Sequence, residues 1–78
     1  MNVRIIKPDS TLYEGPAKLG QLPGTNGRFE LMENHAPIIS ALKAGVVRLV
    51  VSDGDEKKFD IRGGVIKGQQ NEILIMVQ

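Results

Sequence analysis

Residues 22–47 read LPGTNGRFELMENHAPIISALKAGVV, and this alternation of turn signals with short apolar runs decides the fold class. Pro23-Gly24 and Asn26-Gly27 are pairs typical of tight turns, and a short apolar run follows them. A polar bend, Glu33–Pro37, then leads into a second apolar run that stops at Gly45. Apolar runs this short, bounded by turn residues, are typical of β-strands rather than of helices.

The rest of the chain repeats this pattern. Asp53-Gly54 is the strongest hairpin signal, because the pair tolerates the positive φ values of a type I′ turn. Ala44-Gly45 is predicted to turn the chain between two strands, Gly63-Gly64 lies between two others, and a further turn is predicted over 68–71. The predicted strands are residues 3–7, 11–13, 17–22, 28–32, 38–43, 46–52, 57–61, 65–67 and 73–77. Since no segment has helical periodicity, we expect an all-β fold, a small two-layer β-sandwich of about eight to ten short strands that forms a single domain over residues 1–78.

The composition excludes several classes of protein. Seventy-eight residues are too few to divide into two cores, and a chain of this length buries only about 60 to 65 percent of its unfolded surface, so we expect one domain of modest stability. The absence of cysteine excludes disulfides, thiolate metal sites and a cysteine nucleophile. A formal net charge of +1, with one Tyr, two Phe and no Trp, argues against a nucleic-acid partner. No apolar run approaches the roughly 20 residues of a spanning helix, so direct membrane insertion is not expected.

No residue pattern indicates catalysis. His35 is the only histidine, and a lone histidine in a polar bend typically hydrogen-bonds a nearby backbone group. A catalytic or metal-binding role would need converging partners, which the sequence does not place beside it. The loop over Gly24–Gly27 lacks the Gly-Lys-Ser/Thr of a phosphate cradle, and the acidic residues are scattered. We therefore expect a non-catalytic protein with no cofactor, no metal site and no bound nucleotide.

Two strands are apolar on both faces, which a simple two-layer sandwich does not require. Residues 46–51 and 73–77 place valine, leucine, isoleucine or methionine at nearly every position, whereas a sheet with one face in water alternates apolar and polar residues. One interpretation is that these positions close the ends of a small barrel or cover each other. The other is that a partner protein covers a second apolar face. The pattern alone favours neither.

Several punctuating residues recur at the intervals of a known family. The spacing of Leu22-Pro23-Gly24, Gly27, His35-x-Pro37, Leu42 and Gly45 resembles the amino-terminal β-sandwich of the epsilon subunit of F-type (rotary) ATP synthases. That family reads LPG, two residues, G, a short strand, HAP, two apolar residues, Ser or Thr, Ala, Leu or Ile, Lys and Gly. The resemblance extends over nearly the whole chain, through Tyr13-Glu14-Gly15 and Arg62-Gly63-Gly64-Val65.

The resemblance implies a non-catalytic central-stalk subunit in the rotor of a proton- or sodium-driven ATP synthase. In this family the sandwich binds the gamma subunit and touches the polar loops of the c-subunit rotor ring, so that ion flow is coupled to ATP synthesis. Carried over residue by residue, it implies contacts with the rotor ring at Arg28, Glu30, Glu33, Asn34 and His35. It implies contacts with gamma at Lys7, Pro8, Ile38, Ser40 and Leu42. It also implies a peripheral location on the cytoplasmic face of the energy-converting membrane, which would be the bacterial inner membrane.

The chain departs from the family pattern at three points. Arg28 stands where the family often has an acid, so the sign of a ring contact is altered. Glu30 and Asn34 replace glycines common in the family, although Asn tolerates the αL conformation. Most epsilon subunits continue into a helical hairpin that can inhibit the motor or bind ATP. Because this sequence stops at Gln78, we expect neither property.

Other classes of protein share this length and β content. A lipoyl- or biotinyl-type carrier domain needs a modified lysine at an exposed hairpin tip, and the tip Asp53-Gly54-Asp55 has none. Another small β-sandwich binding module remains an alternative. A small stand-alone enzyme is the weakest option, since the chain offers no catalytic constellation.

Overall fold

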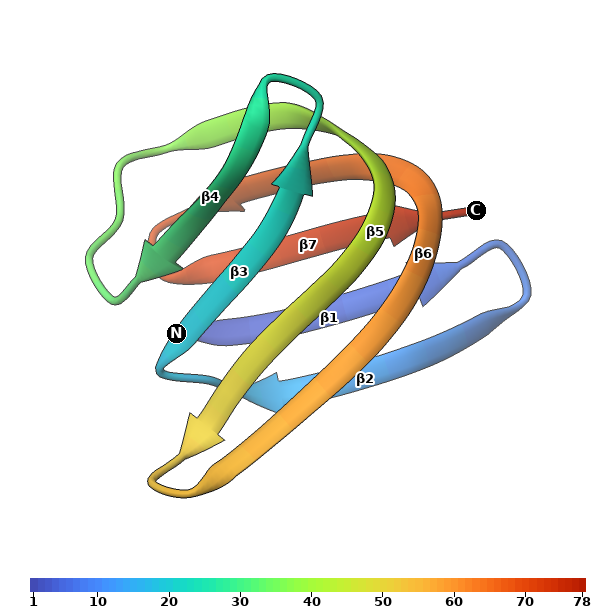
Figure 1. Ribbon diagram of the computed structural model, residues 1–78. Helices are drawn as coiled ribbons and strands as arrows, with labels where there is room; N and C mark the ends of the chain where they lie inside the picture. Colours follow the sequence, from blue (N-terminus) through green and yellow to red (C-terminus); the bar gives the residue numbers. More distant parts are fainter.

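The computed structural model describes residues 1–78 and contains seven β-strands and no helix (Figure 1). The strands are β1 (Asn2–Lys7), β2 (Ser10–Pro16), β3 (Leu19–Gly24), β4 (Gly27–Met32), β5 (Ile38–Ser52), β6 (Asp55–Gln69) and β7 (Glu72–Val77). The predicted all-β fold is confirmed. The count is below the predicted eight to ten, because β5 and β6 each join two strands that the sequence had separated.

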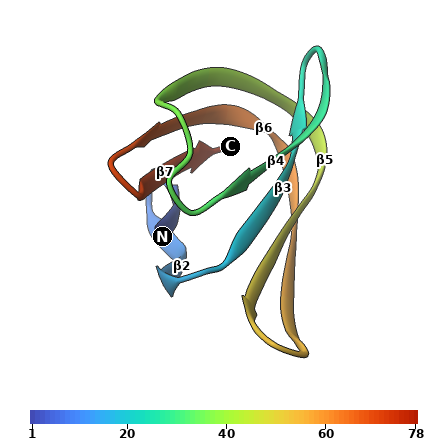
Figure 2. The same ribbon diagram turned by 90° about the vertical axis from the view of Figure 1, so that its left-hand side faces the viewer.

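All seven strands belong to one hydrogen-bonded sheet that folds over on itself. Its order is β2-β1-β7-β6-β5-β3-β4, and every neighbouring pair is antiparallel except β1 and β7. The long strands β5 and β6 pair along their whole length and curve from one side of the molecule to the other (Figure 2). We call the two sides the β1 layer (β2, β1, β7 and residues 38–43 and 63–69) and the β3 layer (β3, β4 and residues 46–52 and 55–61).

The fold is therefore a sandwich whose two layers share strands at one corner. In the β1 layer Leu42 of β5 points into the core, and in the β3 layer Val47 does so, an odd number of residues later. Since side chains alternate along a strand, an odd interval means that the strand has rotated between the two layers. The turn predicted at residues 44–45 and the break at 63–64 are therefore wrong, because pairing between β5 and β6 resumes on both sides of the corner in the same register.

Glycines make this corner possible. A Cβ at Gly45 would lie 2.8 Å from the Cβ of Pro23, so only glycine lets β3 pass this close to β5. Gly63 has a φ of +150°, a backbone conformation that other residues rarely adopt. At Gly64 a Cβ would overlap the carbonyl oxygen of Met76, so the absence of a side chain sets the approach of β6 to β7.

The tight turns occur where predicted, but with a different conformation at one of them. Asp53-Gly54 joins β5 to β6 as expected, and only Gly54 has a positive φ, of 76°. Two successive positive φ values, as a type I′ turn requires, occur instead at Gln70 and Asn71 between β6 and β7. The predicted turn over Gly24–Gly27 is confirmed, with Pro23 inside β3 at a shift in its register with β5. Proline fits there because a shifted register does not need its missing N–H.

Thirteen buried apolar residues form the core between the layers, and no buried side chain is polar or charged. The least exposed large side chains come from both layers: Val3, Ile5, Leu22, Val47, Leu49, Ile66 and Ile75. Tyr13 and Phe59 pack against this core, with ring centroids 6.1 Å apart.

Candidate interaction surfaces

The outer face of the β1 layer carries an exposed row of apolar side chains. Along β7 the side chains of Ile73, Ile75 and Val77 are buried, so Leu74 and Met76 point away from the core. The strand register places Met76 beside Ile6 of β1 and Val65 of β6. Ala41 of β5 continues this row, and Ile39 lies on the same face. We call Ile6, Ile39, Ala41, Val65 and Met76 the apolar patch.

The apolar patch is open to solvent and hollowed at one end. Ile39 is 75% exposed, and Val65 and Met76 are each 40% exposed. A hollow of about 340 Å³ lies beside Met76, and Gly64 contributes no side chain to fill it. The residues that line this hollow are Ile6, Lys7, Pro8, Gly64, Val65, Met76, Val77 and Gln78. Lys7 and Pro8, two of the residues assigned to gamma by resemblance, thus border the apolar patch.

The other three residues assigned to gamma lie differently. Leu42 is only 4% exposed and belongs to the core. Ile38 and Ser40 are half-buried and share its side of β5, whereas Ile39 and Ala41 point outward. The strand assigned to gamma therefore reaches the surface through residues that the sequence analysis did not select. Because side chains alternate along a strand, a buried Leu42 would have predicted that Ala41 and Ile39 point outward.

The two strands that were apolar on both faces have different explanations. On β7, Met76 is open to solvent, which favours a face for a partner. On β5, Val46 and Val50 are half-buried, and Val50 pairs with Leu19 of β3. The outward valines of β5 are therefore partly buried by flanking side chains of the same sheet, whereas Met76 on β7 is more exposed.

The bend between β4 and β5 is anchored to the turn between β6 and β7. The backbone N–H of Asn34 donates to Oδ1 of Asn71 over 2.7 Å, and Asn71 Nδ2 donates back to Asn34 Oδ1 over 3.4 Å. Asn34 has a φ of 63°, so it adopts the αL conformation that asparagine tolerates. Glu33 Oε1 lies 3.4 Å from the amino group of Met1. The bend is thus held by contacts from two distant parts of the chain.

His35 hydrogen-bonds the backbone, as its position in a polar bend predicts. Its Nδ1 lies 2.9 Å from the carbonyl oxygen of Ala36, so a proton on Nδ1 is donated to that oxygen. The other ring nitrogen, Nε2, is buried without a partner. The ring packs against β6, where a Cβ at Gly68 would lie 3.1 Å from His35 Cε1. No group of three or more His, Cys, Asp or Glu side chains converges in the structure to hold a metal.

The structure brings together three of the five residues assigned to the rotor ring. Glu30, Glu33 and His35 line one groove of about 430 Å³ between β4 and the start of β5. Asn34 lies in the same bend and is exposed. Arg28 is exposed at the opposite end of β4, five residues before Glu33 and thus about 16 Å away along an extended strand. We call the residues that line this groove the bend groove: Glu30, Leu31, Met32, Glu33, His35, Ala36, Pro37 and Ile38.

Part of the outer face of the β3 layer is polar and internally paired, next to an apolar row of Met32, Leu19 and Val50. Gln21 Nε2 donates to Glu30 Oε1 across β3 and β4. Arg48 donates to both carboxylate oxygens of Glu56, over 2.7 and 2.9 Å, across β5 and β6. This hydrogen bond lowers the pKa of Glu56 from its ordinary value and raises that of Arg48. We call Gln21, Glu30, Arg48 and Glu56 the polar face.

The structure is thus an all-β domain that carries the apolar patch on the outer face of the β1 layer and the hydrogen-bonded polar face on the β3 layer. No helix in the structure is long and apolar enough to cross a membrane.

Sequence comparison identifies the family. The profile of the family described as ATP synthase, Delta/Epsilon chain, beta-sandwich domain matches residues 1–78. The chain belongs to this family, and the resemblance found in the sequence is confirmed. A carrier domain would need a lysine at the hairpin tip, but Asp53 lies there and pairs with Lys18 over 3.0 Å. No observation therefore supports the carrier-domain alternative.

The relatives include epsilon chains of different lengths. The chain is 39% identical over 77 residues to the ATP synthase epsilon chain of Thermosynechococcus vestitus, a match that covers 99% of this chain and 55% of the relative. It is 35% identical over 74 residues to the ATP synthase epsilon chain of Chlorobium limicola, covering 95% of this chain and 84% of the relative. The chain therefore spans about half the length of the first relative and most of the length of the second.

Solved structures share the fold. A chain in the Euglena gracilis mitochondrial ATP synthase (OSCP/F1/c-ring) superposes with a TM-score of 0.89 at 14% identity, over 96% of this chain and 48% of that one. A chain in the central stalk/c-ring structure of the Tetrahymena thermophila mitochondrial ATP synthase superposes with a TM-score of 0.83 at 14% identity, over 100% of this chain and 63% of that one. At this identity the likeness shows the same β-sandwich fold.

Proposed function

We propose that this chain is a non-catalytic rotor subunit of an F-type ATP synthase that docks on the gamma subunit through the apolar patch and faces the c-subunit ring with the bend groove. The observation that carries this proposal is the apolar row of Ile6, Met76 and Val65, aligned across three strands, in which Met76 and Val65 are each 40% exposed. Exposed apolar clusters of this kind mark interaction sites in soluble domains.

The apolar patch has the anatomy of a long-lived interface. Its centre is apolar, and the exposed cations Lys7 and Lys43 lie at its edge, as in the core and rim of protein interfaces. The hollow beside Met76 can receive one protruding side chain of the partner, which is how anchor residues contribute most of the binding energy. Lys7 and Pro8 keep their assignment to gamma, and Ile39 and Ala41 replace the buried Leu42 on β5.

The bend groove is suited to a second, more polar partner. Glu30 and Glu33 place carboxylates along it, and its apolar floor includes Met32, which is 57% exposed. The polar loops of a c-subunit ring are the kind of surface that exposed charges at a bend can contact, with an energy that salt weakens. Arg28 reaches such a partner only if the contact continues along the outer edge of β4. Asn34 is expected to act through the shape of the bend, because its backbone and side chain are engaged by Asn71.

The proposed mechanism is mechanical. The layers share β5 and β6, and one apolar core fills the space between them, so a load applied at the bend is carried by the whole sheet to the apolar patch. The subunit would thereby couple proton- or sodium-driven rotation of the ring to the stalk and to ATP synthesis. It would be peripheral, on the cytoplasmic face of the energy-converting membrane, and would bind no nucleotide.

The experiment that tests this proposal is reconstitution with a gamma-containing F1 core from which this subunit has been removed. The unmodified chain should bind with a measurable dissociation constant, whereas Met76→Asp should weaken binding at least about 30-fold, as expected for an interface anchor. The matched control is Lys58→Asp, which reverses a charge on an exposed residue of the β3 layer and should bind like the unmodified chain. Equal binding of the unmodified chain and Met76→Asp would overturn the assignment of the apolar patch to gamma.

A further inference from the structure

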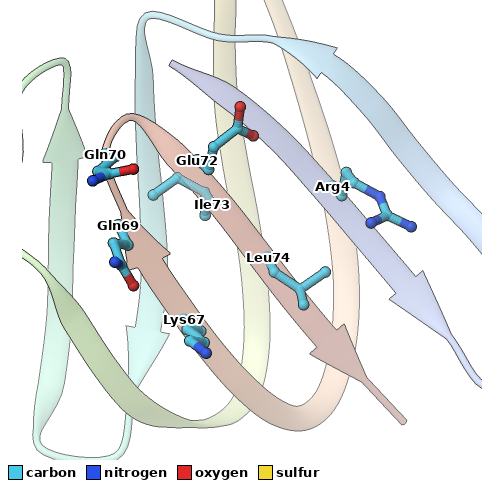
Figure 3. A pocket seen from close by; sticks show the side chains of 7 residues that line it. All are labelled: Arg4, Lys67, Gln69, Gln70, Glu72, Ile73 and Leu74. Atoms are coloured by element: carbon cyan, nitrogen blue, oxygen red, sulfur yellow. The ribbon is translucent and has the colours of Figure 1, made fainter.

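Two cations flank a single leucine next to the apolar patch. The register of β1, β7 and β6 places Arg4, Leu74 and Lys67 side by side on the outer face of the β1 layer. Figure 3 shows the side chains of Arg4 and Lys67 on opposite sides of Leu74. They line a shallow cavity of about 380 Å³ with Gln69, Gln70, Glu72 and Ile73. This row lies two residues along each strand from the row of Ile6, Met76 and Val65.

The positive charge of this row is only partly neutralised within the chain. Lys67 forms no ion pair in the structure, whose four ion pairs involve other residues. Arg4 Nε lies 3.7 Å from Glu14 Oε2, and both side chains are about half exposed or more, so this pair is weak. Glu72 is the one carboxylate that lines the cavity, and it already accepts a hydrogen bond from Asn2 over 3.2 Å.

The location of the row makes its charge matter for docking. A partner that covers Val65 and Met76 also reaches Lys67 and Arg4, since residues two apart on one face of a strand are about 7 Å apart. Covering Lys67 without providing an anion would remove water from an unpaired ammonium group, which costs free energy. Covering it with a carboxylate would instead add a charge pair at the rim of an apolar interface, which favours association and selects the partner.

We propose that the gamma surface that covers the apolar patch carries at least one carboxylate, which pairs with Lys67 and Arg4 over Leu74. This inference rests on the proposed function and adds to it the chemistry of the partner: an apolar ridge flanked by acidic side chains. On the outer face of the β3 layer the cations lie beside a carboxylate instead: Arg48 pairs with Glu56, and Lys58 acts on the same carboxylate.

Binding to the gamma-containing F1 core, measured as a function of salt, tests this inference. At low ionic strength Lys67→Gln should weaken binding about two- to fivefold and flatten its salt dependence, and Lys67→Glu should weaken binding about tenfold or more. Lys67→Arg should bind like the unmodified chain. Lys58→Gln removes an exposed lysine of the same strand on the other layer and should change neither the affinity nor the salt dependence. Both positions are exposed, so unchanged melting temperatures of the four variants are the control for folding.

The outcomes separate this inference from the function on which it rests. If Met76→Asp abolishes binding while Lys67→Glu leaves affinity and salt dependence unchanged, the carboxylate is refuted and the docking face stands. If neither change matters, the docking face itself is wrong. Vesicles of phosphatidylglycerol provide a further arm. Binding of the unmodified chain to them that is lost in Lys67→Gln, with F1 binding intact, would reassign the cations to lipid headgroups and overturn the proposal.

Discussion

The two outer faces of this domain are built on the same two long strands, and those strands present different chemistry on each. On the β3 layer, Arg48 and Glu56 pair across β5 and β6, and Gln21 pairs with Glu30. On the β1 layer the other halves of β5 and β6 present Ile39 and Val65 to solvent, together with Met76 of β7. A face whose polar groups already satisfy each other gains little from a partner, whereas an exposed apolar face gains the free energy of burial. The difference supports the proposal that the β1 layer is the docking side.

The largest expected effect separates the inner and outer sides of one strand. Ile75 is 1% exposed and Met76 is 40% exposed, and the two are adjacent on β7. Ile75→Ala should lower the free energy of unfolding by about 2 to 5 kcal/mol, through lost burial and the cavity left behind. Met76→Ala should cost less than about 1 kcal/mol. Urea unfolding of both variants measures this. Equal costs would mean that Met76 belongs to the core and that the apolar face is not distinct from it.

The next expected effect comes from making the apolar face resemble the polar one. The double variant Val65→Thr with Met76→Gln keeps the strand and removes apolar area, so its affinity for the gamma-containing F1 core should fall about tenfold or more. Titration calorimetry measures this, with circular dichroism to show that the all-β spectrum is retained. If the affinity is unchanged and the fold is retained, the apolar face does not contribute to binding, and the difference between the two faces has no functional role.

A smaller effect concerns the polar face and its dependence on pH. The hydrogen bond from Arg48 lowers the folded-state pKa of Glu56 below its ordinary value of 4.5. The carboxylate therefore contributes stability above that ordinary value, and this contribution is lost as the pH falls through the lowered pKa of the folded state. Glu56→Gln should flatten the acid limb of the curve of melting temperature against pH, and should leave F1 binding at pH 7 unchanged. A steeper acid limb in the variant would contradict the assigned sign.

The smallest expected effect on stability is at the bend end of the molecule. Arg28→Glu and Glu33→Lys reverse exposed charges and should each change the free energy of unfolding by less than about 0.5 kcal/mol. If the bend and β4 face the rotor ring, both should weaken retention on the reconstituted rotor, more strongly at low salt, where exposed charges are less screened. Arg28 tests separately whether the ring contact extends along β4, because it lies away from the bend groove. If the Arg28→Glu chain is fully retained on the rotor at low salt and ion pumping stays coupled, β4 does not contact the ring at Arg28. Any ring contact is then confined to the bend.

Much of the fold followed from local sequence. Short apolar runs and turn pairs are read over a few residues, which is why the all-β class, the hairpin at Asp53-Gly54 and the strand that starts after Pro37 were all predicted. The backbone hydrogen bond of His35 followed from the same kind of reasoning, because it joins neighbouring residues. The family resemblance followed from glycines and prolines at fixed spacing, and those residues are needed where the backbone must turn or approach another strand.

Only the tertiary structure decided what depends on distant pairs. The strands were predicted to break at Ala44-Gly45 and Gly63-Gly64, because glycine there is read as a turn signal. No local pattern reveals that pairing between β5 and β6 resumes in the same register beyond each break. That corner determines which residues face out, so Leu42 was selected for a surface that Ile39 in fact occupies. Composition showed that β5 and β7 have too many apolar residues for one buried face. How far each outward apolar residue is buried depends on its neighbours in the sheet, such as Leu19 of β3 beside Val50. Those neighbours are set by the fold of the whole chain.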